Sequence, residues 1–352
     1  MWPLNPSVRK LCASLRKWRS PDDFYRSETL FSLSHALASW SGGLDRSDLF
    51  PHSDTLFAAL SNAFLLLYGE APLSAFLDTL FVSSVFPGIR REGRDTLFFP
   101  VPLSITPLAS LGTRKKVKKV RFVSWEALRV LLDTFDAKTC SFVVDFQSEK
   151  RLVQWGLQYL VTPEEATQFD SEVVTVGKLL EPHVVLDRAT NCSQNLYFEE
   201  DTWMDSRGSL QPFLFFLCAP GHPAMEAVLR LFIEEGIGGE RFLGKGRFDW
   251  FAMDTLEIPQ EGEYLILFSL AKPRRSELSS LLAYDLMRRG GFIFRGEPVG
   301  VHKNSHHKIV EGSLVRLPFE GENVDVSPLP GQPVISYGKA LGLAFSGRRG
   351  IS

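Results

Sequence analysis

The sequence predicts an α+β protein built from two ferredoxin-like halves, a projecting β-hairpin and a glycine-rich loop. Two runs of alternating strand-like and helix-like segments predict the halves, at 23–140 and 211–352. Between them, residues 141–210 read as short strands and polar loops with little helix, which favours a β-rich insertion that projects from the core. With 352 residues, of which 44% are hydrophobic, the chain is long enough for such a division.

The first half follows the order strand, helix, strand pair, helix, which is typical of a ferredoxin-like unit. Apolar residues from Leu56 to Leu67 repeat at helical spacing, and Ser53 or Asp54 is placed to cap the first turn. The other expected elements are a first strand at 24–33, a helix at 73–82, paired strands at 83–89 and 96–100, a strand end at 120–123, and a helix at 125–135 capped by Ser124.

The second half repeats this pattern without repeating the sequence. An apolar strand at 213–218 precedes a helix at 224–235, and the glycine-rich loop follows that helix. The remaining expected elements are strands at 248–253 and 264–270, a helix at 277–287, a strand at 291–295, and tail strands at 312–317 and 340–345.

The glycine-rich loop at 236–248 holds five glycines and three cations. Glycine permits positive φ and lets a ligand approach backbone N–H groups, while the cations supply positive charge. Gly246 follows Lys245 where a mononucleotide loop needs Ser or Thr, and the helix precedes the loop instead of following it, so ATP and NAD are disfavoured. We expect an RNA or DNA backbone here, held by Gly238, Gly239, Gly244, Gly246, Arg241, Lys245 and Arg247. The alternative is a flexible, solvated connector.

The overall charge limits how nucleic acid can bind. A net charge of −2 and a pI near 6.4 exclude a uniformly basic surface, so contacts must come from local patches. One such patch is the run 114–121, which puts six cations, Lys115 and Lys116 among them, within eight residues. A solvated loop is the equally simple interpretation of this run.

Several classes of protein are disfavoured by what the sequence lacks. The four cysteines form no Cys-x-x-Cys pair, which indicates a reducing compartment and no zinc site. The longest apolar stretch, 56–68, is too short to span a bilayer, so we expect a cytoplasmic protein without a membrane partner. Residues 1–22 are basic, and a basic arm, a strand edge and an upstream start codon remain open as explanations.

Histidines offer the only candidates for catalysis. His306 and His307 lie near Lys303 and Lys308, and His52 precedes a helix, so each could act as acid or base on an RNA 2′-hydroxyl. No carboxylate or cysteine constellation accompanies them, so we expect neither a metal nor a cofactor, and no enzymatic activity.

A hairpin is expected at 183–198, with strand-like flanks around a polar tip at 189–193. An aliphatic hairpin that carries Arg188 and Thr190 near its tip can wedge into a nucleic-acid stack. The alternative is an ordinary surface hairpin whose Tyr197 and Phe198 close over the core.

Five segments occur together in the order seen in one family. They are 51–60, which begins Pro-His-Ser-Asp-Thr-Leu, the hairpin segment 183–190, the loop 238–246, the Glu-Gly-Ser-Leu of 311–314 and the Tyr-Gly-Lys of 337–339. On these segments the chain resembles the fourth Csm subunit of type III-A CRISPR effector complexes, a member of the RAMP superfamily. The resemblance runs from about Leu49 to Phe345, and the N-terminus departs from the family pattern.

The resemblance implies two RRM-like RAMP folds and a subunit that binds the repeat-derived 5′ handle of the CRISPR RNA. It also implies docking against the large cyclase-type subunit and an adjacent backbone RAMP subunit. The loop would then cradle handle phosphates, His52, Ser53 and Asp54 would lie beside the same strand, and the hairpin would be the thumb that kinks the guide.

Two other functions remain as alternatives. Related RAMP proteins cut CRISPR repeats without a metal, and His306, His307 or His52 would be the base of such an endoribonuclease. A structural bridge without RNA contacts of its own is the third possibility, although it would not need the glycine-rich composition of 238–246.

Overall fold

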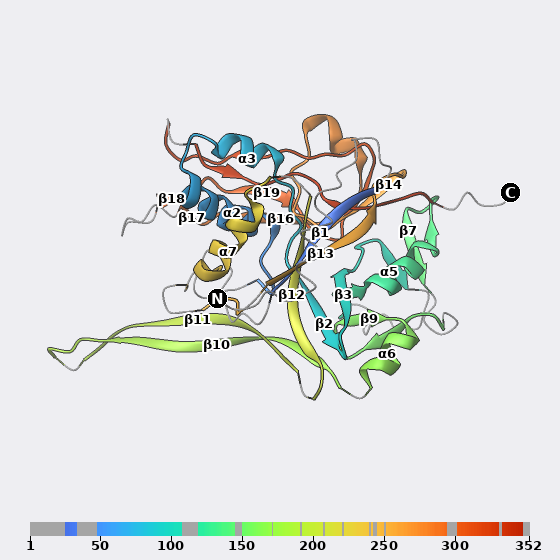
Figure 1. The fold of residues 1–352 in the computed structure, drawn as a ribbon, viewed down its shortest axis with the longest axis horizontal. Coiled ribbons are helices and arrows are strands. Elements are labelled where there is room, and N and C mark those ends of the chain that lie inside the picture. The colour runs from blue at the N-terminus through green and yellow to red at the C-terminus, as the bar shows by residue number, and fades with distance from the viewer. Residues whose placement is uncertain are drawn as a thin grey trace.

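The fold is that of a computed structural model, which describes residues 25–33, 48–107, 119–144, 150–170, 172–190, 192–206, 208–219, 222–238, 241, 245–249, 251–293, 301–330 and 333–347. It is a mixed α+β structure with several sheets and few helices (Figure 1). The basic segment 1–22, the basic residues Lys115 and Lys116, and the loop residues Gly239 and Gly244 lie outside the described residues.

A central sheet organises the molecule. Its strand order is β13-β1-β12-β2-β3-β5-β9-β8. The first four are β13 (Phe251–Pro259), β1 (Tyr25–Leu33), β12 (Gln211–Cys218) and β2 (Phe86–Arg91), each antiparallel to its neighbour. The other four are β3 (Arg94–Pro100), β5 (Phe122–Ser124), β9 (Tyr159–Val161) and β8 (Val153–Trp155).

The connections within this sheet assemble one ferredoxin-like unit from distant parts of the chain. Helix α2 (Ser53–Tyr68) lies between β1 and β2 in the sequence, and helix α7 (Met225–Glu235) lies between β12 and β13. The two helices pack together on one side of the sheet (Figure 1). Taken in sequence order, β1, β2, β12 and β13 therefore form a four-stranded β-α-β-β-α-β arrangement. Its strands come from both expected halves, so those halves do not form separate sheets.

The segment between β3 and the long hairpin adds smaller elements at one end of the sheet. Helix α5 (Trp125–Leu132) is capped as predicted, because the Ser124 hydroxyl accepts a hydrogen bond from the Ala127 backbone N–H at 3.1 Å. The other elements of this part are α6 (Pro163–Phe169), β4 (Ile105–Pro107), β6 (Phe135–Asp136) and β7 (Ser141–Val144). Helix α3 (Leu73–Thr79) comes earlier in the chain, directly after α2.

The C-terminal part forms a second sheet and three short ribbons. The sheet has the order β15-β20-β14-β23, from β14 (Tyr264–Leu267), β15 (Leu281–Ala283), β20 (Leu314–Arg316) and β23 (Gly342–Phe345). The ribbons pair β16 (Leu286–Arg289) with β19 (His306–Ile309), β17 (Phe292–Ile293) with β18 (Val301–His302), and β21 (Val324–Asp325) with β22 (Ile335–Ser336).

The helix predicted at 277–287 is wrong. A 3₁₀ helix, η2 (Arg275–Ser280), occupies its start, and the rest of the segment pairs with other strands as β15 and β16. The Glu277 carboxylate accepts hydrogen bonds from the backbone N–H groups of Arg274 and Glu320, which ties the short turn to a distant loop. Pairing with β20 and β19 thus outweighs the local helical spacing.

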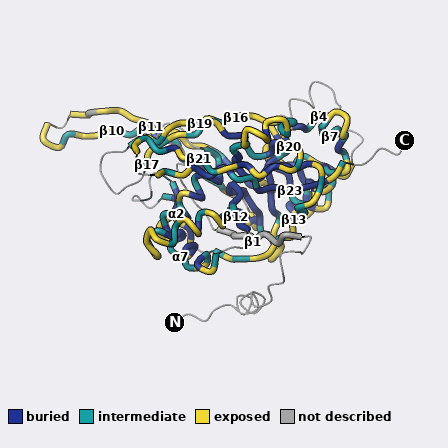
Figure 2. The backbone as a smooth tube through the Cα atoms, turned by 90° about the horizontal axis from the view of Figure 1, so that it is seen from above, coloured by how far each residue is buried: buried dark blue, intermediate teal, exposed yellow. Residues whose placement is uncertain are grey.

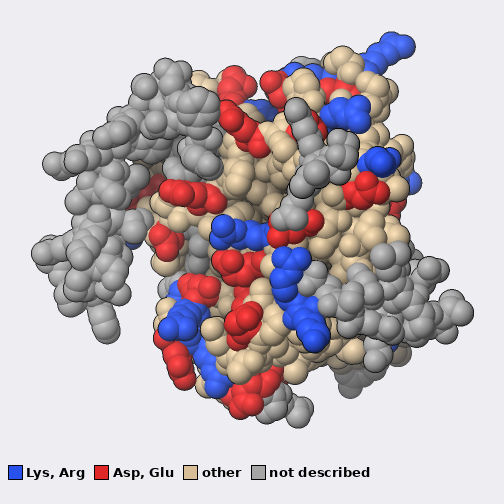
Figure 3. Space-filling model, turned by 90° about the vertical axis from the view of Figure 1, so that its right-hand side faces the viewer, with Lys and Arg blue, Asp and Glu red and all other residues tan. Residues whose placement is uncertain are grey.

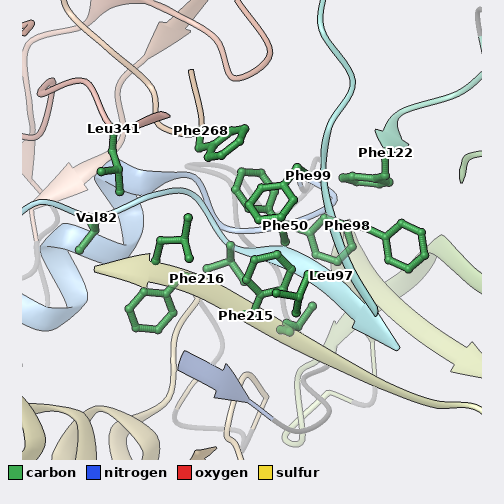
Figure 4. Packing of buried hydrophobic residues seen from close by; sticks show 14 of the residues in the cluster. Phe50, Val82, Leu97, Phe98, Phe99, Phe122, Phe215, Phe216, Phe268 and Leu341 are labelled. Carbon is green, nitrogen blue, oxygen red and sulfur yellow. The ribbon is translucent and has the colours of Figure 1, made fainter. Parts of the chain in front are cut away.

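One phenylalanine-rich core joins the two sheets. The ring of Phe99 on β3 lies 5.3 Å from that of Phe215 on β12 and 4.6 Å from that of Phe268, which follows β14 (Figure 4). All three side chains are fully buried. Large aromatic side chains contribute much of the stability of a core when they are fully buried. These ring contacts therefore hold the C-terminal sheet firmly against the central sheet.

Candidate nucleic-acid interface

The most prominent feature of the surface is a long β-hairpin. Strand β10 (Val174–Leu186) pairs antiparallel with β11 (Ser193–Ser206), and the pair projects beyond the rest of the molecule (Figure 1). Away from its base the hairpin is mostly exposed (Figure 2). The hairpin predicted at 183–198 is therefore confirmed, and it is longer than predicted.

The hairpin tip is ordered by a local turn. The Asp187 carboxylate accepts hydrogen bonds from the backbone N–H groups of Ala189 at 2.8 Å and Thr190 at 3.4 Å. These bonds hold the pKa of Asp187 below its usual value. Arg188 and Thr190 are exposed at the tip, as an RNA contact at this point would require.

The two faces of the hairpin differ in chemistry. Successive residues of a strand point to opposite faces, so the register places Leu180, Pro182, Val184, Leu196 and Phe198 on one face. These side chains are exposed, up to 66% for Leu196. Phe198 is 43% exposed, so the alternative in which it closes over the core is wrong. A contiguous exposed apolar face of this kind marks an interaction surface.

The opposite face is acidic and turns toward the glycine-rich loop. Glu181, His183, Tyr197, Glu199 and Asp201 alternate with the apolar set. Over its whole length the hairpin carries more carboxylates than cations, with Glu181, Asp187, Glu199, Glu200, Asp201 and Asp205 against Lys178 and Arg188. The strands of the hairpin are therefore a poor electrostatic match for phosphate, whereas the tip has Arg188.

Lys245 connects the glycine-rich loop to this acidic face. Its ammonium group lies 2.6 Å from the Asp201 carboxylate and 3.3 Å from that of Glu199. Arg247 is exposed beside it, and the Arg241 guanidinium lies 3.9 Å from the Glu235 carboxylate. The cation expected to bind phosphate is thus already paired with the hairpin. Sequence analysis missed these partners because they lie 44 and 46 positions away in the chain and leave no local pattern.

The loop closes on the end of α7. The Ile237 backbone N–H donates to the Gly246 carbonyl at 3.0 Å. Gly236 and Gly246 both have φ of 71°, and a Cβ added to Gly236 would lie 2.7 Å from the Gly246 carbonyl oxygen. Gly238, whose φ is 116°, continues the turn. Glycine is therefore required for the backbone geometry at the mouth of the loop.

The start of α2 is buried in an ionic cluster that joins this helix to the C-terminal part. The Nδ1 atom of His52 lies 2.7 Å from the Glu311 carboxylate, and its Nε2 atom lies 3.6 Å from that of Asp48. Burial alone would lower the pKa of the His52 imidazole, but the carboxylates of Glu311 and Asp48 raise it to about 10. His52 is therefore a cation at neutral pH, and the Ser84 hydroxyl also donates to Glu311.

Asp54 is the centre of the second half of this cluster. The Arg289 guanidinium makes two hydrogen bonds to its carboxylate, both at 2.9 Å, and the Lys308 ammonium group makes a third at 3.0 Å. Burial opposes ionisation of Asp54, yet Arg289 and Lys308 hold its pKa well below the usual range. Burial lowers the pKa of Lys308 to about 8. Removing one partner would leave the others charged and buried.

The expected cap of this helix needs correction. Ser53 and Asp54 do not cap α2, because His52 occupies the cap position and makes no side-chain cap bond. Their side chains do not face solvent either: Ser53 is fully buried and its hydroxyl accepts the Leu270 backbone N–H, while Asp54 is 5% exposed. In this structure the two side chains bind other segments of the chain, namely the Leu270 backbone and Arg289.

The His52 pKa predicts a pH dependence of stability. The folded pKa exceeds the ordinary value of 6.5, so the stabilisation is fully present below pH 6.5 and is lost as pH rises toward 10. Between pH 6.5 and 8 we expect the unfolding free energy to fall by up to about 1.4 kcal/mol per pH unit relative to His52→Gln. Urea titrations of both proteins across this range measure the difference, and parallel curves would contradict it.

Charges on one face of the body are intermingled (Figure 3). The face shown in Figure 3 carries Lys and Arg beside Asp and Glu, without one continuous basic patch. Within the described ranges, no group of three or more His, Cys, Asp and Glu side chains is arranged to hold a metal ion. No helix in the described part of the chain is long and apolar enough to cross a membrane.

The fold is shared with solved structures of one class of CRISPR subunit. The Csm3–Csm4 subcomplex of the type III-A CRISPR-Cas interference complex matches with a TM-score of 0.63 and 20% identity, over 90% of this chain and 99% of the matched chain. A Csm1–Csm4 cassette in complex with pppApA matches with a TM-score of 0.50 and 19% identity, over 92% of this chain and 100% of the matched chain. The chain thus shares its mixed α+β fold with these two matched chains.

Sequence comparisons find similarity to one family and to several of its curated members. Residues 260–345 match the CRISPR Csm4 C-terminal domain. The chain is 24% identical over 335 residues to a CRISPR system protein Csm4 of Methanocaldococcus jannaschii, covering 82% of this chain and 84% of that protein. A Csm4 protein of Mycobacterium tuberculosis strain H37Rv is 26% identical over 321 residues, covering 86% and 92%. The resemblance to the fourth Csm subunit of type III-A complexes is confirmed.

Proposed function

We propose that the chain is a non-catalytic subunit of a type III-A CRISPR effector complex that holds the 5′ handle of the CRISPR RNA. In this proposal it docks against the large cyclase-type subunit and an adjacent backbone RAMP subunit. The observation that supports it best is the long hairpin with the glycine-rich loop fastened to its acidic face through Lys245. The similar solved chains occur in a Csm3–Csm4 subcomplex and a Csm1–Csm4 cassette, which supports the choice of partners.

The two faces of the hairpin suggest a division of work. The apolar face, Leu180, Pro182, Val184, Leu196 and Phe198, fits an adjacent protein subunit, because its exposed apolar area would be removed from water there. The tip and the glycine-rich loop would then be the parts that contact RNA. In this proposal the hairpin is the thumb: the apolar face of its strands contacts a protein subunit, and its tip reaches the guide RNA.

RNA contacts are assigned to the exposed cations around the loop. Arg247 is exposed, and Arg241 is partly exposed at the end of α7. Lys245 can serve phosphate only by sharing or leaving Asp201 and Glu199. His52 and Asp54, which are tied to Glu311, Arg289 and Lys308, stabilise the body that carries the loop instead of touching RNA.

The endoribonuclease alternative depends on a histidine that can act as a base. His52 is unsuited, since its pKa is about 10 and Glu311 holds its Nδ1 atom. His306 turns inward beside Lys308, and burial lowers its pKa to about 4. His307 is exposed, which leaves it as the histidine that the alternative would require.

Incubation of the purified chain with labelled repeat RNA separates the two functions. We expect a mobility shift on a native gel and intact RNA on a denaturing gel, with and without Mg²⁺. Cleavage that is lost in His307→Ala would support the endoribonuclease instead. Neither a shift nor products at low salt would favour the structural bridge.

The cations assigned to RNA make a quantitative prediction. Arg241→Ala and Arg247→Ala should each weaken handle-RNA binding and reduce the slope of log K against log salt by about 0.7, because each removes about one phosphate contact with a single strand. Arg230→Ala is the matched control, since Arg230 is an exposed cation on α7 paired with Glu226. Anisotropy titrations at two salt concentrations give both quantities.

Releasing Lys245 from its acidic partner should act in the opposite direction. Asp201→Asn removes the closer of the two carboxylates and is expected to raise RNA affinity, because Lys245 is then less neutralised. Unchanged affinity in all of these variants would mean that the loop is only a connector.

A further inference from the structure

A basic ribbon in the C-terminal part is not used by the proposed function. Strands β16 and β19 form one ladder and β17 and β18 form another, and a hydrogen bond of 3.0 Å from the Lys303 backbone N–H to the Gly291 carbonyl links them. No acidic residue is among the paired residues of the two ladders. The paired residues do include two arginines, one lysine and three histidines: Arg288, Arg289, Lys308, His302, His306 and His307.

The inner face of this ribbon packs against the protein interior. Arg289 and Lys308 bind Asp54 at the start of α2. Their neighbours along the strands alternate outward, as the exposure of Arg288 and His307 shows. The buried ion pairs thus fix the ribbon on the body and present its other face to solvent.

The side chains of Arg288, Phe292, His302 and His307 are exposed, and together they are called the outer ribbon face. Arg288 and His307 are opposite each other in one ladder, and Phe292 and His302 are opposite each other in the second. The Phe292 ring is 56% exposed, and its centroid lies 4.0 Å from that of His302. The Arg288 guanidinium is held by the Ser305 hydroxyl at 3.0 and 3.2 Å, so it is oriented although it is exposed.

We infer that the outer ribbon face binds single-stranded RNA, with a base stacked on Phe292 and a phosphate on Arg288. An exposed aromatic ring on a ribbon that also exposes an arginine, without a carboxylate among its paired residues, is the combination that single-strand binders use. Figures 1 and 2 place β17 at the end of the body beyond which the hairpin projects. An RNA strand held at the hairpin therefore has a second contact surface at the same end of the molecule. This inference rests on the proposed function, because that function supplies the RNA.

Titration of fluorescent oligouridine into the full chain tests this site. We expect Phe292→Ala to weaken binding about tenfold, since loss of one stacked base commonly has such an effect. Leu278→Ala is the control, because Leu278 is 54% exposed in η2 and lies outside the ribbon. Abasic RNA should bind the unaltered chain about as weakly as oligouridine binds Phe292→Ala, and should lose no further affinity in that variant.

The outcomes distinguish this inference from the proposed function. Loss of affinity in Arg247→Ala with none in Phe292→Ala or Arg288→Ala would overturn the ribbon site and leave handle binding intact. The reverse result would retain the ribbon site and remove the loop from the interface. Absence of oligouridine binding by the unaltered chain, or a Phe292→Ala defect only in assembly with another protein, would also overturn the inference.

Discussion

Asp54→Asn is expected to lower the free energy of unfolding by about 3–5 kcal/mol, the largest effect that we expect of a single substitution. The carboxylate receives two hydrogen bonds from Arg289 and one from Lys308, and Lys308 is fully buried. The amide keeps the shape of the side chain but removes the charge, so two buried cations lose their common partner. Urea denaturation followed by tryptophan fluorescence measures the change.

Glu226→Gln provides the matched comparison for that experiment. Glu226 pairs with Arg230 on the surface of α7, where both side chains are largely exposed, so its removal should change the unfolding free energy by less than about 1 kcal/mol. A similarly small change in Asp54→Asn would show that the cluster around Asp54 is as well solvated as a surface pair. The ion pairs of Asp54 would then not be what anchors α2 to the C-terminal part.

Replacing Leu196 and Phe198 together by Ser is expected to weaken docking of the adjacent protein subunit at least tenfold while leaving the fold intact. These residues are 66% and 43% exposed on the apolar face of the hairpin, so the free chain loses little packing. In a complex, however, each would bury apolar surface worth about 1.5–3 kcal/mol when fully covered. Pull-down titrations with the partner subunits measure the loss, and melting curves check the fold.

Leu179→Ser is the control for this prediction. Leu179 is 49% exposed on β10 of the same hairpin, but the register pairs it with Asp201 and places it on the acidic face. If Leu179→Ser impairs docking as much as the double substitution, the face assignment is wrong. If neither variant impairs docking, the apolar face has no protein partner among the subunits tested.

The tip of the hairpin can be tested separately from its shaft. Shortening 189–193 should leave folding and handle binding intact, because an exposed tip contributes little to the core. In a reconstituted complex it should change the chemical reactivity of the nucleotide next to the handle, since a wedge contact is worth on the order of 1–3 kcal/mol. If the reactivity of that nucleotide is unaltered, the hairpin does not act as a thumb.

Local patterns in the sequence determined several elements. Helical spacing from Leu56 onward predicts α2, the hydroxyl of Ser124 predicts the start of α5, and the apolar run 213–218 predicts β12. The hairpin followed from its strand-like flanks and polar tip. These features depend on residues only a few positions apart, which is why propensity and capping chemistry are enough to find them.

The tertiary structure alone decided how these elements combine. Residues 259 positions apart form the pair between His52 and Glu311, and residues 235 apart form the pair between Asp54 and Arg289. The same folding turned the expected helix at 277–287 into strands and drew strands of both expected halves into one sheet. Ion pairing and strand pairing depend on which surfaces meet in space, so the Ser53 and Asp54 that suggested a helix cap became buried ligands of another segment.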